Sequence, residues 1–181
     1  MGKTSAALLL RDKLKASYFN LTDLALRDNL TLGKDEKRDS IIIDEAKMKK
    51  KLVTIIKKTY SDIIIDGHYA ANVVPRKLVT FAFVLRRDPV ELKELMKKSG
   101  FSEAKQNENL AAEILDVCLV DALGAGLVEK ICEIDVTGKS PEQVVKAIIK
   151  TMADPERCRF GSIDWLGKLE KEGLLEEYLK M

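Results

Sequence analysis

Short apolar runs alternate with longer segments of helical periodicity along this 181-residue chain. Continuous apolar runs at 63–66, 80–85 and 130–136 are typical of strands buried on both faces, and 18–21 is a shorter strand candidate. Segments with helically spaced apolar residues follow at 4–16, 44–58, 89–98, 103–123 and 141–152. Strands that alternate with helices predict right-handed βαβ crossovers. We therefore expect an α/β fold, a parallel sheet with helices on both faces.

Two polar stretches interrupt this alternation, and a third segment follows it. Residues 20–43 carry a dense cluster of acids and bases and are predicted to be an inserted, substrate-side segment. Residues 98–108 are polar around a glycine, which is typical of a mobile lid. We expect a core over 1–152 and a helical tail over 153–181, with Trp165 as its anchor.

Composition narrows the class of protein. A hydrophobic content of 46% suits one domain with a full core. The 31 basic and 29 acidic residues leave a net charge of +2, which gives no general attraction to nucleic acids or membranes. With no signal peptide and no apolar run long enough for a bilayer, we expect a monomeric cytoplasmic protein without membrane contact.

The spacing of the cysteines suggests neither a disulfide framework nor a zinc site, so Cys118 and Cys132 are expected to be small buried side chains.

The first residues, Gly2-Lys3-Thr4-Ser5, match the second half of a phosphate-binding loop. In such a loop, backbone amides and a helix N-terminus bind phosphates, the lysine neutralises them, and the hydroxyl holds Mg²⁺. The preceding strand and first glycine of the motif are missing from this sequence. The short motif is therefore a weak signal unless later residues agree with it.

Asp66 ends the apolar run at 63–66, where it can complete such a site. Ligands of open α/β sheets bind beyond the carboxyl ends of the strands, so Asp66 is expected to hold Mg²⁺ together with Thr4. An ordinary Asp-Gly turn is the alternative. His68, the only histidine, is either a structural hydrogen-bonding group or a catalytic one that positions water or an acceptor oxygen.

Further basic and polar residues follow the later strands. Arg76 is either a surface residue at a helix start or a bidentate ligand of a nucleotide phosphate. Arg86 is predicted to face phosphate, while Arg87 is predicted to satisfy the entry of the next helix. Ser99, in the lid, and Lys139 complete the candidate nucleotide contacts.

Taken together, the motifs resemble those of the adenylate kinase isoenzyme 6 family, the archaeal and nuclear adenylate-kinase-like NTPases of small-subunit ribosome assembly. The resemblance extends to about residue 152. It rests on Gly2-Lys3-Thr4-Ser5, Asp23-Leu24, Gly33-x-Asp35-Glu36-x-x-Asp39, Asp44-Glu45, Asp66-Gly67-His68-Tyr69-Ala70, Val74-Pro75-Arg76, Val84-Leu85-Arg86-Arg87-Asp88-Pro89 and Ala112-Glu113-Ile114-Leu115-Asp116-Val117-Cys118.

This resemblance implies a P-loop NTPase fold of the nucleoside monophosphate kinase type. The implied ligands are ATP, Mg²⁺ and AMP, with ATPase activity and with a small-subunit ribosomal protein and the pre-ribosomal small subunit as partners. Lys3 and the amides after Gly2 would bind ATP, His68 would assist transfer, and Arg76 would hold the acceptor phosphate. The stretch 20–43, which on periodicity alone could equally be a solvated loop, would bind the monophosphate, and 98–108 would be the lid.

The chain departs from the family pattern in two places. The upstream strand and the Gly-x-Pro-Gly part of the loop are absent, which predicts a sheet without its central strand. The lid reads Ser99-Gly100-Phe101 where the family has Arg-Gly-[Trp/Tyr], and losing such a cation can cost ~10³ in rate. Two alternatives therefore stay open: a catalytically weakened P-loop binding protein acting as a ribosome-assembly factor, or a kinase for another small acceptor.

Overall fold

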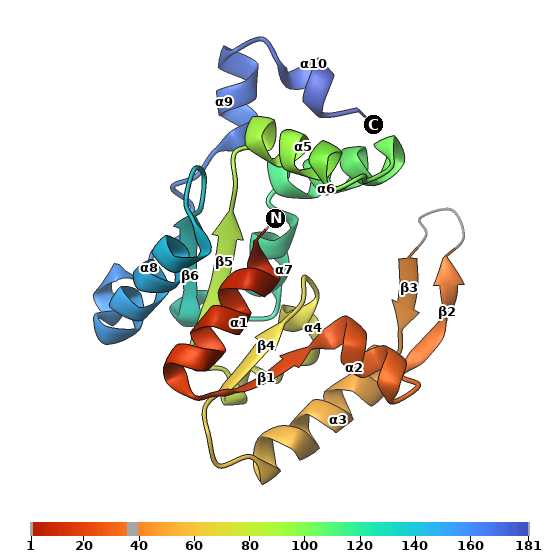
Figure 1. The fold of residues 1–181 in the computed structure, drawn as a ribbon, viewed down its shortest axis with the longest axis vertical. Coiled ribbons are helices and arrows are strands. Elements are labelled where there is room, and N and C mark those ends of the chain that lie inside the picture. Colours follow the sequence, from red (N-terminus) through yellow and green to blue (C-terminus); the bar gives the residue numbers. More distant parts are fainter. Residues whose placement is uncertain (1, 36–39, 181) are drawn as a thin grey trace.

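Two pairs of parallel strands form the centre of the molecule in the computed structural model, which describes residues 2–35 and 40–180. Strand β1 (Ser17–Asn20) pairs with β4 (Ile63–Asp66), and β5 (Ala82–Arg86) pairs with β6 (Ile131–Asp135). Helices lie on both sides of these strands (Figure 1). The α/β class and the positions of all four expected strands are confirmed.

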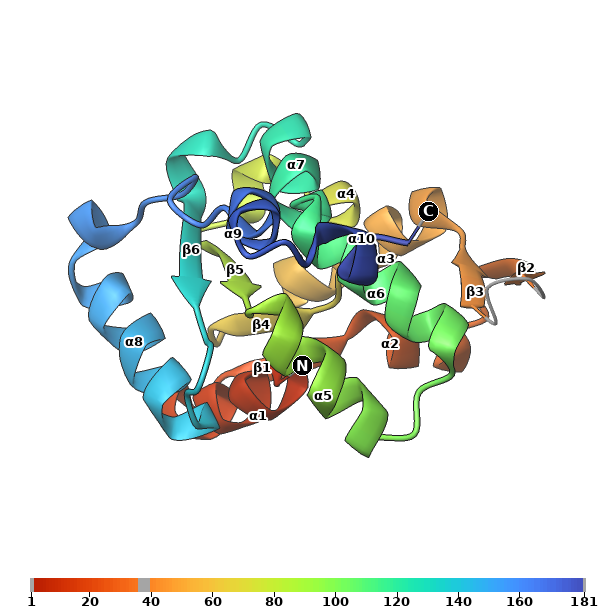
Figure 2. The ribbon, with the colours of Figure 1, turned by 90° about the horizontal axis from the view of Figure 1, so that it is seen from above.

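The two strand pairs are not joined by hydrogen bonds in the described part of the chain. They nevertheless share a core, because Ile64 of β4 and both Phe83 and Leu85 of β5 pack against one buried cluster. Helices α1 (Lys3–Leu14) and α8 (Pro141–Ala153) supply that cluster's buried residues along with Val136. Figure 2 shows these two helices on one side of the strands, with α4 (Ala70–Val73) and α7 (Val117–Gly124) on the other. This arrangement matches the expected sheet without a central strand.

The inserted segment has more structure than its polar sequence indicated. It forms α2 (Leu21–Arg27) and an antiparallel hairpin of β2 (Thr31–Asp35) and β3 (Ser40–Ile43). The hairpin extends away from the strand pairs (Figure 1), and α3 (Glu45–Lys58) follows it. The β2 sequence Thr-Leu-Gly-Lys-Asp lacks apolar alternation, and its register shifts between Thr31 and Gly33, which explains why periodicity missed it.

The segment expected to be the lid, 98–108, spans the end of one helix and the start of the next. Helix α5 (Pro89–Lys98) connects through a tight turn at 99–102 to α6 (Glu103–Ile114). Phe101 in this turn packs against the buried cluster beneath the two helices. The single helix expected over 103–123 is also corrected: it breaks at Asp116, whose φ is +57°, before α7 begins.

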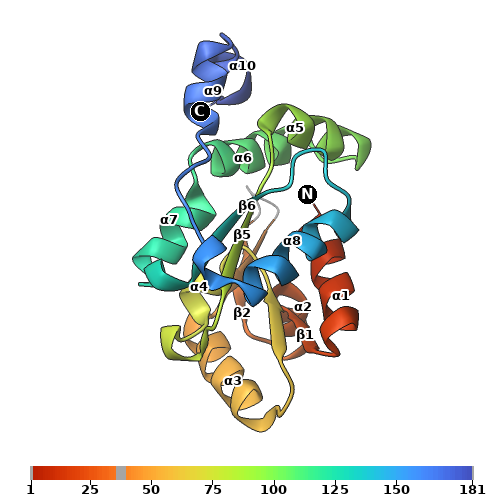
Figure 3. The same ribbon diagram turned by 90° about the vertical axis from the view of Figure 1, so that its left-hand side faces the viewer.

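The tail packs on the same two helices. Helices α9 (Trp165–Lys171) and α10 (Leu175–Tyr178) lie against α5 and α6 at one end of the molecule (Figure 3). Trp165 is 8% exposed and its Nε1 donates a hydrogen bond to Glu113, which confirms it as an anchor. Short 3₁₀ turns complete the fold at Arg76–Leu78, Val128–Lys130 and Pro155–Arg157.

One cysteine prediction is wrong. Cys132 of β6 is not a free buried thiol but forms a disulfide with Cys158, which follows α8. The two residues are 26 positions apart in sequence, and their Cα atoms are 4.4 Å apart. Spacing alone could not reveal this pair, because the return of the chain after α8 brings them together. Cys118 is free and partly exposed. Within the described residues no helix is long and apolar enough to cross a membrane.

Candidate functional site

The N-terminus of α1 lies at the carboxyl ends of both β4 and β5. On the β4 side, Thr4 Oγ1 donates a hydrogen bond of 2.8 Å to Asp66 Oδ2. On the β5 side, Gly2 lines a small cavity with Leu85 and Arg87. The half-motif at the start of the sequence and the acid at the end of β4 therefore meet, as the sequence predicted.

Asp66 is buried and surrounded by neutral hydrogen-bond donors. It is 8% exposed, and its Oδ2 accepts hydrogen bonds from Thr4, from the Tyr18 hydroxyl at 2.9 Å and from Asn20 Nδ2 at 3.3 Å. Burial and the neighbouring Asp66 raise the pKa of Tyr18 above its ordinary value. Sequence reasoning missed both Tyr18 and Asn20. Their spacing of two residues on β1 was the available signal, since it places them on one face of a strand.

Thr4 and Asp66 suit a magnesium ion. Mg²⁺ prefers oxygen ligands and usually takes only one or two from the protein, the others being water and phosphate. A hydroxyl and a carboxylate in hydrogen-bond contact are the protein ligands that P-loop NTPases provide. Among the described residues, no group of three or more His, Cys, Asp or Glu side chains could hold a metal by itself. A magnesium ion here would therefore need a phosphate ligand.

The first turn of α1 suits an anion. Gly2 precedes the helix with φ +85°, a conformation that glycine adopts without strain, and no side chain caps the helix. The first turn of this 12-residue helix contains no acidic residue of its own, so none of its side chains competes with an anion for the positive end of the helix. Lys3 and Ser5 belong to this turn. The structure thus brings Gly2, Lys3, Thr4 and Ser5 together with Asp66.

His68 lies close enough to this turn to be influenced by its charge. Gly67 precedes it at a point where a Cβ would be 2.8 Å from Leu21, so the chain passes closer to α2 than another residue could. Desolvation and the positive charges of Lys3 and Lys105 lower the pKa of His68, although its side chain is solvent-accessible. The printed contacts of His68 are with other residues: its carbonyl accepts a hydrogen bond from Cys118 at the start of α7, and its ring lies edge-on to Tyr69.

Arg86 does not face this site. Its guanidinium is buried and donates to Glu113 Oε1 at 2.8 Å, to Glu133 Oε1 at 2.5 Å and to Asp116. Burial opposes the charge, but these carboxylates prevail and raise the pKa of Arg86 above its ordinary value. The prediction that Arg86 faces phosphate is corrected, because every guanidinium nitrogen is already bonded within the protein.

Arg76 lies at the opposite edge of the strands. Its carbonyl accepts a hydrogen bond of 2.9 Å from Lys130, which directly precedes β6, so Arg76 is near the amino end of that strand. Its side chain is 56% exposed and 4.0 Å from Glu129. This position is away from the carboxyl edge of the strands, where an acceptor phosphate was expected. Arg76 instead borders a surface groove of about 640 Å³ that α3, α4 and α7 also line.

The remaining predicted residues are Lys139, Ser99 and those of the cluster Gly33–Asp39. Lys139 borders the small cavity beside Gly2, but its Nζ donates to the carbonyl of Asp135. Ser99 is the C-cap of α5, a 10-residue helix that begins at Pro89, so Ser99 lies ~15 Å from the start of that helix. Of the cluster Gly33–Asp39, residues 36–39 lie outside the described residues.

A parallel α/β fold with a Gly-Lys-Thr helix start bonded to the acid of a neighbouring strand defines the P-loop NTPase class. Comparison with known proteins agrees, because the family model described as "AAA domain" matches residues 1–116. A protein of Methanocaldococcus jannaschii named "Putative adenylate kinase" is 35% identical over 168 residues, 93% of this chain and 89% of that protein.

Two further proteins with the same name give similar values. The one from Saccharolobus solfataricus is 35% identical over 181 residues, which cover all of this chain and 90% of the relative. The one from Methanococcus maripaludis is 33% identical over 171 residues, 92% of this chain and 90% of the relative. The chain belongs to this family of adenylate-kinase-like NTPases. It has a nucleotide-kinase-like function, that of a phosphotransferase.

Proposed function

We propose that this protein is a monomeric, Mg²⁺-dependent nucleoside monophosphate kinase that converts ATP and AMP to two ADP. In that reaction the bond between the γ-phosphorus of ATP and its bridging oxygen breaks, and a bond to an AMP phosphate oxygen forms. The observation that carries the proposal is the hydrogen bond between Thr4 and Asp66, which joins the start of α1 to the carboxyl end of β4.

The first turn of α1 would hold the ATP phosphates. Lys3 and the backbone amides after Gly2 supply positive charge and donors, and Thr4 and Asp66 supply oxygen ligands for Mg²⁺. Bound Mg²⁺ would neutralise charge on the phosphates. Tyr18 and Asn20 would keep the Asp66 carboxylate oriented when the Thr4 hydroxyl turns from it toward the metal.

His68 would assist the acceptor. Its lowered pKa keeps the imidazole neutral at pH 7, so one ring nitrogen can accept a hydrogen bond from an attacking water or a protonated phosphate oxygen. The insert 20–43 would bind AMP, and the 98–108 segment would close over ATP. Lys105, whose charge acts on His68, would partly replace the lid arginine where this chain has Ser99. An ammonium group lacks the planar fork of arginine, so slower turnover is expected.

A second role is supported by the family resemblance and by Ser99 in the lid. A protein with weakened transfer to AMP could still hydrolyse ATP, or only bind it, while acting with a small-subunit ribosomal protein on the pre-ribosomal small subunit. This role needs the same Thr4–Asp66 site but no acceptor nucleotide.

A coupled assay for ADP formation, with ATP alone and with ATP plus AMP, separates these functions. Turnover that requires AMP supports the kinase, and equal turnover without AMP supports the ATPase. Lys3→Met and Asp66→Asn should each lower turnover by about 10²- to 10³-fold. Lys13→Met changes an exposed lysine in the last turn of α1 and should leave the rate unchanged. Absence of both turnover and Mg-ATP binding in the parent protein would refute the proposal.

A further inference from the structure

We infer that Arg87 binds a phosphoryl group of the nucleotide across from the N-terminus of α1. This inference rests on the proposed function, but it assigns a role to a residue that the sequence pattern gave to the helix entry. It starts from the burial of Arg87, which is 8% exposed as a residue. Its Nε is buried and has no hydrogen-bond partner among the described residues. Buried donors are almost always paired, so this nitrogen is expected to have a ligand.

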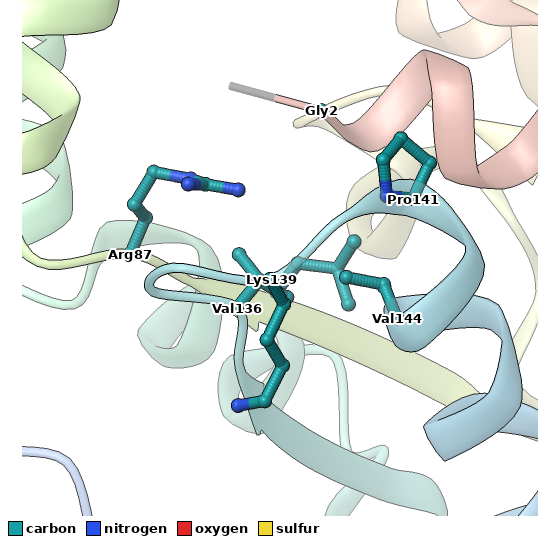
Figure 4. A pocket seen from close by; sticks show the side chains of 7 residues that line it. Gly2, Arg87, Val136, Lys139, Pro141 and Val144 are labelled. Atoms are coloured by element: carbon teal, nitrogen blue, oxygen red, sulfur yellow. The ribbon is translucent and has the colours of Figure 1, made fainter.

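The free edge of the guanidinium points to the phosphate-binding turn. Nη2 is 3.6 Å from the position that a Cβ on Gly2 would occupy. Figure 4 shows the side chain extended from the end of β5 toward Gly2. Nε and Nη2 form the side-on fork of arginine, whose two parallel N–H groups match a pair of phosphate oxygens. The α1 helix supplies backbone donors and positive potential from the other side.

The opposite edge of the same guanidinium is fixed. Nη1 is bonded to Glu91, and the other oxygen of Glu91 accepts a hydrogen bond of 2.8 Å from the Gly138 amide. Glu91 thus orients Arg87 and ties it to the loop between β6 and α8. Glu91 contributes one negative charge, whereas Arg87 and Lys139, which line the cavity, contribute two positive charges, so the local balance still favours an anion.

The size of the cavity limits what can enter. Its volume of about 30 Å³ is that of a single small group, and Leu85, Val136, Pro141 and Val144 line the rest of it. A phosphoryl oxygen fits between Gly2 and Arg87, whereas a whole nucleotide does not. The remainder of the nucleotide would lie at the mouth of the cavity, toward Thr4 and Asp66.

Isothermal titration of the full chain with Mg-ATP and with adenosine tests this assignment. Arg87→Gln should weaken Mg-ATP binding by about 10- to 100-fold, the range for loss of charge-assisted hydrogen bonds, and leave adenosine binding unchanged. Arg87→Lys keeps the charge without the fork and should give a smaller loss. Arg157→Gln, at an exposed arginine paired with Asp154, is the matched control and should bind like the parent.

Failure of this inference and failure of the proposed function give different results in these titrations. A Kd for Mg-ATP in Arg87→Gln equal to that of the parent would overturn the inference and leave the proposed function intact. If the parent itself does not bind Mg-ATP, the proposed function fails. Inorganic pyrophosphate then tests Arg87 alone: binding that depends on Arg87 supports the assignment, and no binding refutes it. Glu91→Gln removes the neighbouring negative charge and should tighten pyrophosphate binding, a gain that a merely destabilised variant would not show.

Discussion

The carboxyl ends of β4 and β5 each carry a buried charged side chain, but the surroundings of the two charges are opposite. Asp66 ends β4 among neutral donors, namely Thr4, Tyr18 and Asn20. Arg86 ends β5 in ion pairs with three carboxylates. A buried carboxylate that accepts hydrogen bonds only from neutral groups keeps its charge and can still bind a cation. A buried guanidinium that is already paired with carboxylates cannot bind a further anion. The first end is therefore suited to bind an ion, and the second is a structural junction.

The junction also joins distant parts of the chain. Glu113 of α6 accepts hydrogen bonds from Arg86, from the Arg87 amide and from Trp165 in the tail. Glu133 of β6 binds Arg86 and accepts a hydrogen bond from the Gly161 amide. One guanidinium thus connects β5, β6, the α6–α7 break and, through these acids, the segment after α8.

Arg86→Met should give the largest loss of stability and would sharpen this comparison most. Removing the cation leaves Glu113, Asp116 and Glu133 clustered without their common partner, and breaking a buried ion pair this way costs about 3–5 kcal/mol. Urea denaturation followed by circular dichroism measures the free energy of unfolding. A loss below about 1 kcal/mol, the range of exposed ion pairs, would show that Arg86 is no structural junction.

Asp66→Asn should change stability much less while removing the metal ligand. The amide keeps an oxygen that can accept from Thr4 and Tyr18, so the free energy of unfolding should change by less than about 1.5 kcal/mol. The same urea titration measures this, with Arg86→Met as the contrasting variant. A gain of stability in Mg²⁺ and ATP should disappear in Asp66→Asn. Equal losses in both variants would remove the distinction between the two strand ends.

The sequence revealed the strands and the acid at the end of β4 because both depend on local patterns. Continuous apolar runs locate β4, β5 and β6, and Asp66 follows from its place after one of them. The prediction for Arg86 was wrong, since neighbouring residues on a strand point to opposite sides and Arg86 faces the acids. Arg87 is bonded to Glu91 in the first turn of α5, as its predicted role at the helix entry requires. Periodicity at the end of β5 does not show which side carries the acids. Those acids come from α6, from the α6–α7 break and from β6.

The predictions for Arg76 and Cys132 were wrong because both positions depend on the path of the chain in three dimensions. Arg76 follows a Pro-Arg motif near Asp66 in sequence, yet the chain after α4 returns to the amino end of β6 before β5 begins. The disulfide of Cys132 depends on where the chain passes after α8. Tertiary path decides each of these positions, and one sequence carries little information about it.

The smallest expected effect is a change in the pKa of His68, which measures the electrostatic effect of α1 on the segment that follows β4. Desolvation, Lys3 and Lys105 lower the pKa of His68 below 6.5. As pH falls through 6.5 the unfolded chain therefore takes up a proton before the folded one does. The stability that neutral His68 contributes is present above pH 6.5 and is lost between that pH and its lowered folded pKa.

Because the chain has one histidine, proton NMR can follow His68 without assignment ambiguity. Its midpoint should lie below 6.5 in the parent and move upward in Lys3→Met, because the variant lacks a repelling charge. Lys13→Met, at the other end of α1, should leave the midpoint in place. An unchanged midpoint in Lys3→Met would separate His68 from the phosphate-binding turn and restrict the site to Thr4, Asp66 and their neutral partners.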